Sequence, residues 1–233
     1  MLLNVENLQA GYGKKEVLHD MSIQVDAGEI VALIGHNGAG KSTALKAIFG
    51  LIAPSGGEVY FDGEKVTHEK PIKKLAKGIF HIPQEKYIFS DLSVKDNLEL
   101  SYFTVADKSE FLSRLEYIFD LFKILGERQN QLAGTLSGGE RRMLGIAMSL
   151  IRRPKLLFLD EPSSGLSPIA FQSVIQTIRK INRDQNTAVL LVEQNVRAAF
   201  KLSNRVYVMK TGRIIFEETG AKLLQRSEWW DLF

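Results

Sequence analysis

The chain has 233 residues, of which 45% are hydrophobic and 24% charged, so it can bury a core and is not a globally disordered chain. A formal net charge of +3 is too small to indicate nucleic-acid binding, which requires a clustered basic face. The absence of cysteine excludes disulfides, cysteine-ligated zinc and cysteine nucleophiles, and the four histidines have no metal-ligand spacing.

The first part of the chain predicts an antiparallel sheet. Apolar and polar residues alternate over about the first 30 residues and again at 58–62, close to turn signals at 27–28 and 55–57. Alternation with a period of two is typical of strands that bury one face. We therefore expect an antiparallel β subdomain.

Three short, almost purely apolar runs lie at 30–34, 156–159 and 188–192. Such runs are typical of strands that are buried on both faces of a parallel sheet. Helical patterns alternate with them, and one helix is expected to begin after Ser167 as its N-cap, with Pro168 in the first position. This alternation predicts an α/β fold with a mostly parallel sheet.

Residues 93–150 carry the densest helical pattern of the chain. We interpret them as a helical subdomain inserted into a single domain that spans residues 1–233. The aromatic tail at 229–233 is expected to dock onto the chain's own core or onto a neighbour. No apolar run approaches the ~20 residues of a membrane span, and the N-terminus lacks the pattern of a signal peptide. We therefore expect a cytoplasmic protein that reaches a membrane only through a partner.

A glycine-rich segment at 35–42 fits G-x-x-x-x-G-K-[ST] and lies between a predicted strand and a helical pattern. Glycines let the backbone curl so that successive N–H groups point at phosphate oxygens, and the following helix adds the positive end of its dipole. Lys41 is expected to reach the β- and γ-phosphates, and Ser42 to ligate Mg²⁺. The candidate nucleotide-binding residues are Gly35, His36, Asn37, Gly38, Ala39, Gly40, Lys41, Ser42 and Thr43.

The apolar run at 156–159 ends in two acids, Asp160 and Glu161. After a phosphate-binding loop, such a strand end is expected to supply a carboxylate that holds Mg²⁺, here Asp160. Glu161 is placed to orient or deprotonate the attacking water. The two motifs together predict a nucleoside triphosphatase built on a P-loop NTPase core.

The segment Leu136–Glu140, followed by Arg141 and Arg142, stands just before a helical pattern and about 20 residues ahead of Asp160. It resembles the signature of ABC-type ATPases, and the resemblance covers essentially the whole chain. The resemblance implies that the signature of one subunit closes on the ATP held by the P-loop of another, in a head-to-tail dimer. The residues implied to contact the nucleotide are Ser137, Gly138, Gly139 and Glu140.

The same resemblance assigns three further positions. Tyr12 stands where the family has an aromatic residue that stacks on adenine, and Gln84 where it has a glutamine that touches Mg²⁺ and water and senses the membrane partner. Gln194 occupies the position of a histidine that contacts the γ-phosphate in most members. A glutamine can donate a neutral hydrogen bond but cannot carry a positive charge. Two further departures are Glu140, where glutamine is commoner, and Ser167, where aspartate is usual.

The combination of LLVEQN, SSGLSP and LSGGE is similar to the second ATPase of branched-chain amino acid importers, the LivF type. This resemblance implies ATP and Mg²⁺ as cofactors, transmembrane permease subunits and a second, similar ATPase as partners, a solute-binding protein as an indirect partner, and no nucleic acid. An exporter or lipid-transport ATPase would share every ATP motif, so it stays open as an alternative. A soluble ABC ATPase that acts on nucleic acid or ribosomes is a second alternative.

Apolar residues follow Gln84 at positions 87, 88, 89 and 92. They have two interpretations, which are not exclusive. They either pack between subdomains or form a groove that accepts a helix of the membrane partner.

Overall fold

The computed structural model describes residues 1–85, 87–102 and 108–226. The aromatic tail at 229–233 therefore lies outside the described residues. Within the described parts of the chain, none of the helices is both long enough and apolar enough to span a bilayer.

The amino-terminal strands form an antiparallel sheet of four strands in the order β2-β1-β4-β5. Buried and exposed residues alternate along much of these strands, because one face of the sheet covers the core. The predicted antiparallel part is confirmed. The strands are β1 (Leu3–Tyr12), β2 (Lys15–Val25), β4 (Gly56–Phe61) and β5 (Glu64–Lys65).

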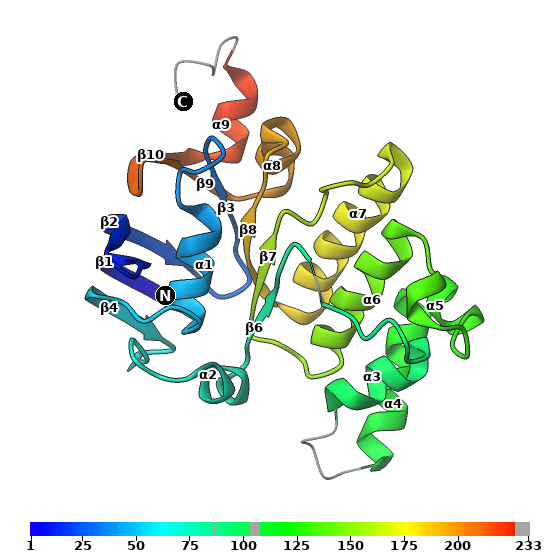
Figure 1. The fold of residues 1–233 in the computed structure, drawn as a ribbon. Coiled ribbons are helices and arrows are strands. Elements are labelled where there is room, and N and C mark those ends of the chain that lie inside the picture. The colour runs from blue at the N-terminus through cyan, green and yellow to red at the C-terminus, as the bar shows by residue number, and fades with distance from the viewer. Residues whose placement is uncertain (86, 103–107, 227–233) are drawn as a thin grey trace.

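A second sheet of six strands, in the order β10-β9-β3-β8-β7-β6, forms the centre of the molecule (Figure 1). All of its neighbouring pairs are parallel except β9 and β10. The three predicted apolar runs are strands β3, β7 and β8, and every residue in them is buried. The α/β fold class is thereby confirmed. The strands are β3 (Ile30–Ile34), β6 (Ile79–Ile82), β7 (Leu156–Asp160), β8 (Ala188–Val192), β9 (Arg205–Lys210) and β10 (Arg213–Thr219).

Helices cover both faces of this central sheet. Helix α1 packs between it and the antiparallel sheet, whereas α6 and α7 pack on the opposite face (Figure 1). Ser167 caps α7 by accepting a hydrogen bond from the Ala170 backbone N–H at 3.3 Å, and Pro168 is its first residue, as predicted. The helices are α1 (Lys41–Phe49), α2 (Pro71–Lys77), α3 (Val94–Tyr102), α4 (Lys108–Leu121), α5 (Lys123–Glu127), the 3-10 helix η1 (Ala133–Thr135), α6 (Gly138–Leu150), α7 (Pro168–Gln185), α8 (Val196–Leu202) and α9 (Gly220–Gln225).

The segment expected to be helical, 93–150, contains α3, α4, α5, η1 and α6. It leaves the central sheet after β6 and returns to it at β7, and α3 to α5 lie beyond α6 on the far side of that helix (Figure 1). The side chains of this segment share one apolar cluster with α7 and with one face of the central sheet. This packing ties α6 to the strands that carry the site described below.

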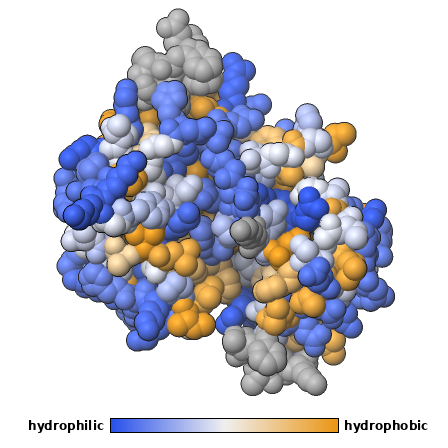
Figure 2. Space-filling model, viewed as in Figure 1, coloured by the Kyte–Doolittle hydropathy of each residue, from blue (hydrophilic) through white to orange (hydrophobic). Residues whose placement is uncertain are grey.

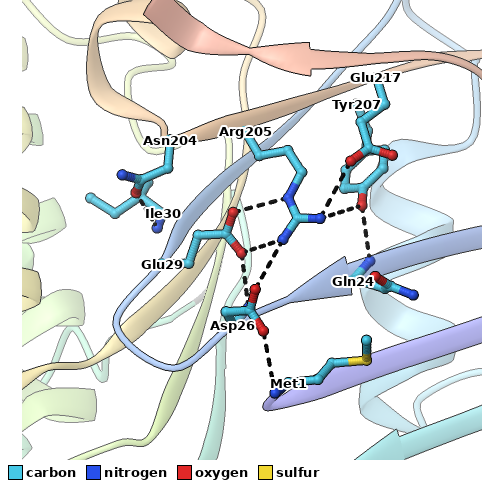
Figure 3. Close-up of polar contacts among 9 residues, drawn as sticks. All are labelled: Met1, Gln24, Asp26, Glu29, Ile30, Asn204, Arg205, Tyr207 and Glu217. Atoms are coloured by element: carbon cyan, nitrogen blue, oxygen red, sulfur yellow. Dashed lines mark hydrogen bonds and ion pairs between the residues drawn. The ribbon is translucent and has the colours of Figure 1, made fainter.

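A group of acidic side chains around a single arginine, Arg205, joins the central sheet to the antiparallel sheet (Figure 3). Arg205 of β9 binds both carboxylate oxygens of Glu29, at 2.9 and 2.8 Å, and also contacts Asp26 and Glu217. The amino group of Met1 lies 3.3 Å from Asp26. The hydrogen bonds to Glu29 raise the pKa of Arg205 above its usual range. A planar guanidinium suits this bidentate contact, which fixes the connection between β2 and β3 against β9.

Candidate functional site

Four loops meet at one edge of the central sheet. They follow β3, β8, β7 and β6, which are consecutive neighbours in the sheet, and all four strands point their carboxyl ends the same way. Crevices at the carboxyl ends of such strands are where open α/β sheets bind ligands. The candidate residues after these strands therefore converge because of topology rather than sequence proximity.

The loop after β3 is shaped by its glycines. Gly40 has a φ of 108° and forms the N-cap of α1, and a Cβ atom added to Gly35 would lie 2.2 Å from the carbonyl oxygen of Met209. The Lys41 ammonium donates to the carbonyl oxygens of Gly35 and His36 at 2.8 and 3.0 Å. Burial lowers the pKa of Lys41, while Glu161 and Asp160 oppose that shift. The loop thus encloses the ammonium group of Lys41.

The amino end of α1 has no side-chain cap and no acidic residue in its first turn among the described residues. Its first N–H groups and the Lys41 ammonium therefore present positive potential to the crevice. Such an end binds an anion, and the loop curls as a phosphate cradle does.

Ser42 and Asp160 meet although 118 residues separate them. The Ser42 hydroxyl donates to Asp160 Oδ1 at 3.0 Å, and burial raises the pKa of Asp160 against the opposing effect of that hydrogen bond. A hydroxyl and a carboxylate are oxygen ligands of the kind that Mg²⁺ prefers. Across the described parts of the chain, no group of three or more His, Cys, Asp or Glu side chains could hold a metal alone. The Ser42 hydroxyl and the Asp160 carboxylate are the residues that would fit a Mg²⁺ ion here.

Glu161 receives two side-chain amides. Gln194 Nε2 lies 2.8 Å from each of its carboxylate oxygens, and Gln84 Nε2 lies 3.1 Å from Oε2 and 3.1 Å from the Ser164 hydroxyl. Glu161 is buried and has a φ of 47°, a left-handed conformation that non-glycine residues rarely adopt. The loops after β6 and β8 thus orient the carboxylate that follows β7 through neutral amide donors.

Arg142 of α6 is the first site residue that the sequence reasoning missed. Its guanidinium donates to the carbonyl oxygens of Pro83, Gln84 and Glu161 at 3.1, 3.0 and 3.4 Å, and lies 4.5 Å from the centre of the Tyr87 ring. Burial lowers the pKa of Arg142. The available signal was its position three residues after the buried Gly139, on the inner face of the helix. Arg142 ties the signature helix to the loops around Glu161.

The second missed residue is Glu193, which directly precedes Gln194. It is a buried carboxylate that accepts hydrogen bonds from Ser163 and from its own loop. The sequence signal was an acid at the end of an apolar strand, the same signal that identified Asp160 and Glu161.

The predicted signature residues lie apart from the P-loop of the same chain. Ser137 caps α6, and the Glu140 carboxylate accepts from the Ser137 backbone N–H at 2.7 Å in a reciprocal capping box. A Cβ atom added to Gly139 would lie 2.8 Å from the Cβ atom of Ala170, so glycine allows α6 to approach α7. Helix α6 packs on the opposite face of the central sheet from α1.

Tyr12 and the apolar residues after Gln84 stand at the edges of the region. Tyr12 ends β1 with 51% of its surface exposed. Tyr87 and Ile88 pack on the cluster below α6, whereas Phe89 is 53% exposed. The first interpretation of these residues, packing, thus describes Tyr87 and Ile88. The face shown in Figure 2 carries separate apolar patches on a mostly polar surface.

The family model described as ABC transporter matches residues 18–164, which is more than half of the chain. A branched-chain amino acid transport ATP-binding protein of Pseudomonas aeruginosa, BraG, is 42% identical and covers 96% of this chain and 95% of its own. A probable LivF protein of Archaeoglobus fulgidus is 38% identical over 97% and 96% of the two chains. The lipopolysaccharide export protein LptB of Escherichia coli K12 is 32% identical over 96% and 92%.

Solved structures are similar over nearly the full length. An ATP-binding cassette of an ABC transporter in its ADP conformation has a TM-score of 0.89 at 24% identity, covering 99% of this chain and 97% of its own. A dimeric cassette in a post-hydrolysis state with ADP and Pi has a TM-score of 0.81 at 25% identity, covering 94% and 98%.

The P-loop around Lys41, the Ser42–Asp160 contact and the oriented Glu161 carboxylate agree with these similarities. The chain therefore belongs to the ABC transporter family, as an ATP-binding subunit that hydrolyses ATP to power transport.

Proposed function

We propose that this chain powers the import of branched-chain or other hydrophobic amino acids. The observation that carries this proposal is the near-full-length identity to BraG and LivF, 42% and 38%, which exceeds the 32% identity to LptB. These two relatives are named for branched-chain amino acid transport, and the coverage leaves almost no part of the chain unmatched.

In the proposed reaction, Lys41 and the backbone N–H groups of residues 35–43 hold the phosphates of ATP, and Tyr12 stacks on adenine. Ser42, Asp160 and the amide oxygen of Gln84 would hold Mg²⁺, which would supply positive charge against the phosphates. The support for these roles is the 3.0 Å contact between Ser42 and Asp160 at the mouth of the P-loop.

Glu161 accepts a proton from the attacking water, and the Gln194 amide keeps the carboxylate aimed at it. The support for this assignment is the pair of 2.8 Å contacts between Gln194 Nε2 and Glu161.

The second phosphate cradle, Ser137–Glu140, acts on the ATP of a second cassette in a head-to-tail dimer. The dimeric relative with ADP and Pi and the separation of α1 from α6 within one chain support this arrangement. We propose that residues 1–233 act as one nucleotide-binding domain with a helical subdomain at about 93–150.

Permease subunits hold the protein at the cytoplasmic face of the membrane, a solute-binding protein acts through them, and nucleic acid has no role. The exposed apolar side chain of Phe89, five residues after Gln84, and that of Leu132, whose backbone pairs with Ser93, support a permease contact there. Lipid export is the alternative function, and the LptB relatives are the observation that favours it.

The test is to purify the chain with its membrane partners and reconstitute the complex in proteoliposomes. We expect ATP-dependent uptake of radiolabelled leucine and no uptake of glutamate, and loss of uptake in the Glu161→Gln variant. Extraction of lipid without leucine uptake would replace import with export. Recovery of the chain with ribosomes or nucleic acid, and without membrane subunits, would overturn the transport assignment.

A further inference from the structure

Glu193 is a buried carboxylate with no part in the reaction described above. Glu193 is 1% exposed. Burial raises the pKa of its carboxyl group, whereas the hydrogen bonds from Ser163, Asn195 and Gln194 lower it. A buried carboxylate destabilises a fold unless its oxygens are fully hydrogen-bonded. The contacts that compensate for this burial therefore indicate what Glu193 does.

The carboxylate accepts four hydrogen bonds from two loops. From the loop after β7, Ser163 donates its backbone N–H to Oε1 at 3.1 Å and its hydroxyl to Oε2 at 2.7 Å. From the loop after β8, the backbone N–H groups of Gln194 and Asn195 donate to Oε2 at 3.1 and 3.4 Å. Glu193 is thus a polar link between two loops whose strands are neighbours in the sheet.

Both linked loops lead to Glu161. Gln194 is held at its backbone by Glu193 and reaches Glu161 with its side-chain amide. Ser163 stands two residues after Glu161 and opens the segment Ser163–Pro168, in which Ser164 contacts Gln84. A movement of that segment would therefore pull on Glu193 and, through it, on the amide that orients the Glu161 carboxylate.

We propose that Glu193 is a positioning residue that couples the segment Ser163–Pro168 to Gln194, so that the setting of this segment determines how Glu161 is oriented. The proposal rests on the proposed function, in which Glu161 is the base and a second cassette binds head to tail, and it further assigns the segment 163–168 to the face that meets this second cassette. Glu193 would thus connect, within one chain, the interface between the cassettes to Glu161.

The substitution Glu193→Gln weakens the contacts of residue 193 with Ser163 and keeps those with Gln194 and Asn195. A glutamine whose oxygen takes the place of Oε2 still accepts from Gln194 and Asn195, but its NH₂ group then faces the Ser163 N–H, which is also a donor. This breaks the contact from the Ser163 backbone, whereas the Ser163 hydroxyl and the backbone N–H groups of Gln194 and Asn195 still donate to the remaining oxygen. Ser163→Ala removes the other Ser163 contact, that of its half-buried hydroxyl, and Ser203→Ala is the matched control, because the buried Ser203 hydroxyl donates to the Ala199 carbonyl oxygen at 2.6 Å outside the site.

The experiment measures kcat and KM for ATP, together with the melting temperature, in the reconstituted transporter. We expect Glu193→Gln to lower kcat about 10-fold while KM changes less than about twofold, since the phosphate cradle is untouched. Ser163→Ala should lower kcat less, and the double variant should lose more than Glu193→Gln alone but less than the product of the two single losses, because both substitutions weaken the same link; Ser203→Ala should keep the wild-type kcat.

Wild-type kcat in Glu193→Gln would overturn the proposal. So would additive losses in the double variant, or a loss of kcat that follows the melting temperature in all variants, Ser203→Ala included. Failure of the proposed function has a different signature, because Glu161→Gln would then hydrolyse ATP at the wild-type rate or leucine uptake would not depend on ATP.

Discussion

Helices α1 and α6 both begin at segments that the sequence assigns to phosphate binding, and their amino ends are prepared in different ways. The end of α1 has a left-handed glycine as N-cap and a lysine in its first position, whereas α6 begins with Ser137 and Glu140 in a closed capping box. A capping box satisfies donors within the helix, while an uncapped end leaves them to a ligand. The difference fits the proposed roles, in which α1 binds nucleotide within its own chain and α6 presents a stable, pre-folded surface to the nucleotide of a second cassette.

The largest effect is expected at α1. Lys41→Ala should lower ATP hydrolysis by about 1,000-fold, or about 4 kcal/mol, because the ammonium no longer offsets phosphate charge in the transition state. It should also weaken ATP binding by the purified chain in a calorimetric titration, and Ser137→Ala should leave that binding unchanged. Equally weakened ATP binding in both variants would contradict the proposed difference between α1 and α6.

The next effect concerns what α6 does inside its own chain. Arg142→Ala leaves three carbonyl oxygens around Pro83, Gln84 and Glu161 without their charged donor, so we expect a loss of about 3 kcal/mol in the free energy of unfolding. Arg141→Ala is the matched control, because Arg141 is more exposed and donates to Leu136 and Gly134 within its own segment. Urea denaturation measures both, and a similar loss in the two variants would contradict the tie between α6 and the site.

The carboxyl end of α1 gives a pH-dependent test. The Lys74 side chain is buried, donates to the Ile48 carbonyl oxygen at 2.6 Å, and has its pKa lowered by burial to about 8, with Glu69 opposing. Between pH 8 and the ordinary lysine pKa of 10.5, the unfolded chain binds more protons than the folded one, so the free energy of unfolding rises with pH.

Lys74→Met removes this dependence. We expect the wild type to gain about 2 kcal/mol relative to Lys74→Met between pH 7.5 and pH 10, measured by urea denaturation at both pH values. Parallel pH profiles for the two proteins would show that folding does not lower the pKa of Lys74.

The smallest effect is expected at the amino end of α6. Glu140→Gln keeps an acceptor for the Ser137 N–H but loses the charge that favours the helix dipole and the 3.3 Å ion pair with Arg128. The loss in stability should be about 0.5 kcal/mol, seen as a small drop in melting temperature. Glu140→Ala removes the capping box and should lose more stability than Glu140→Gln. A smaller loss in Glu140→Ala would mean that the capping box does not stabilise the amino end of α6.

Much of this architecture follows from local patterns. Strands β3, β7 and β8 were predictable because strands buried on both faces leave no room for polar residues, and the start of α7 because Ser167 and Pro168 form a complete local signal. The P-loop was predictable because its backbone requires glycine at fixed positions.

Contacts that depend on how distant segments pack could not be predicted in the same way. Nothing in the sequence near Arg142 indicates that its guanidinium reaches the loop after β6, and nothing near Lys74 indicates that its ammonium ends beneath α1. Likewise, Gln84 and Gln194 were assigned separate roles, and only the folded sheet brings both amides to Glu161.

The left-handed backbone at Glu161 has a consequence for engineering and evolution. With a φ of 47°, this residue holds a conformation that costs a side-chain-bearing residue about 1 kcal/mol and that glycine and asparagine adopt more readily. A library of variants screened for heat resistance alone would therefore enrich glycine or asparagine at position 161. The survivors would be robust proteins that still hold nucleotide and have lost the carboxylate needed to turn it over, so thermal screens of this protein must be paired with an activity screen.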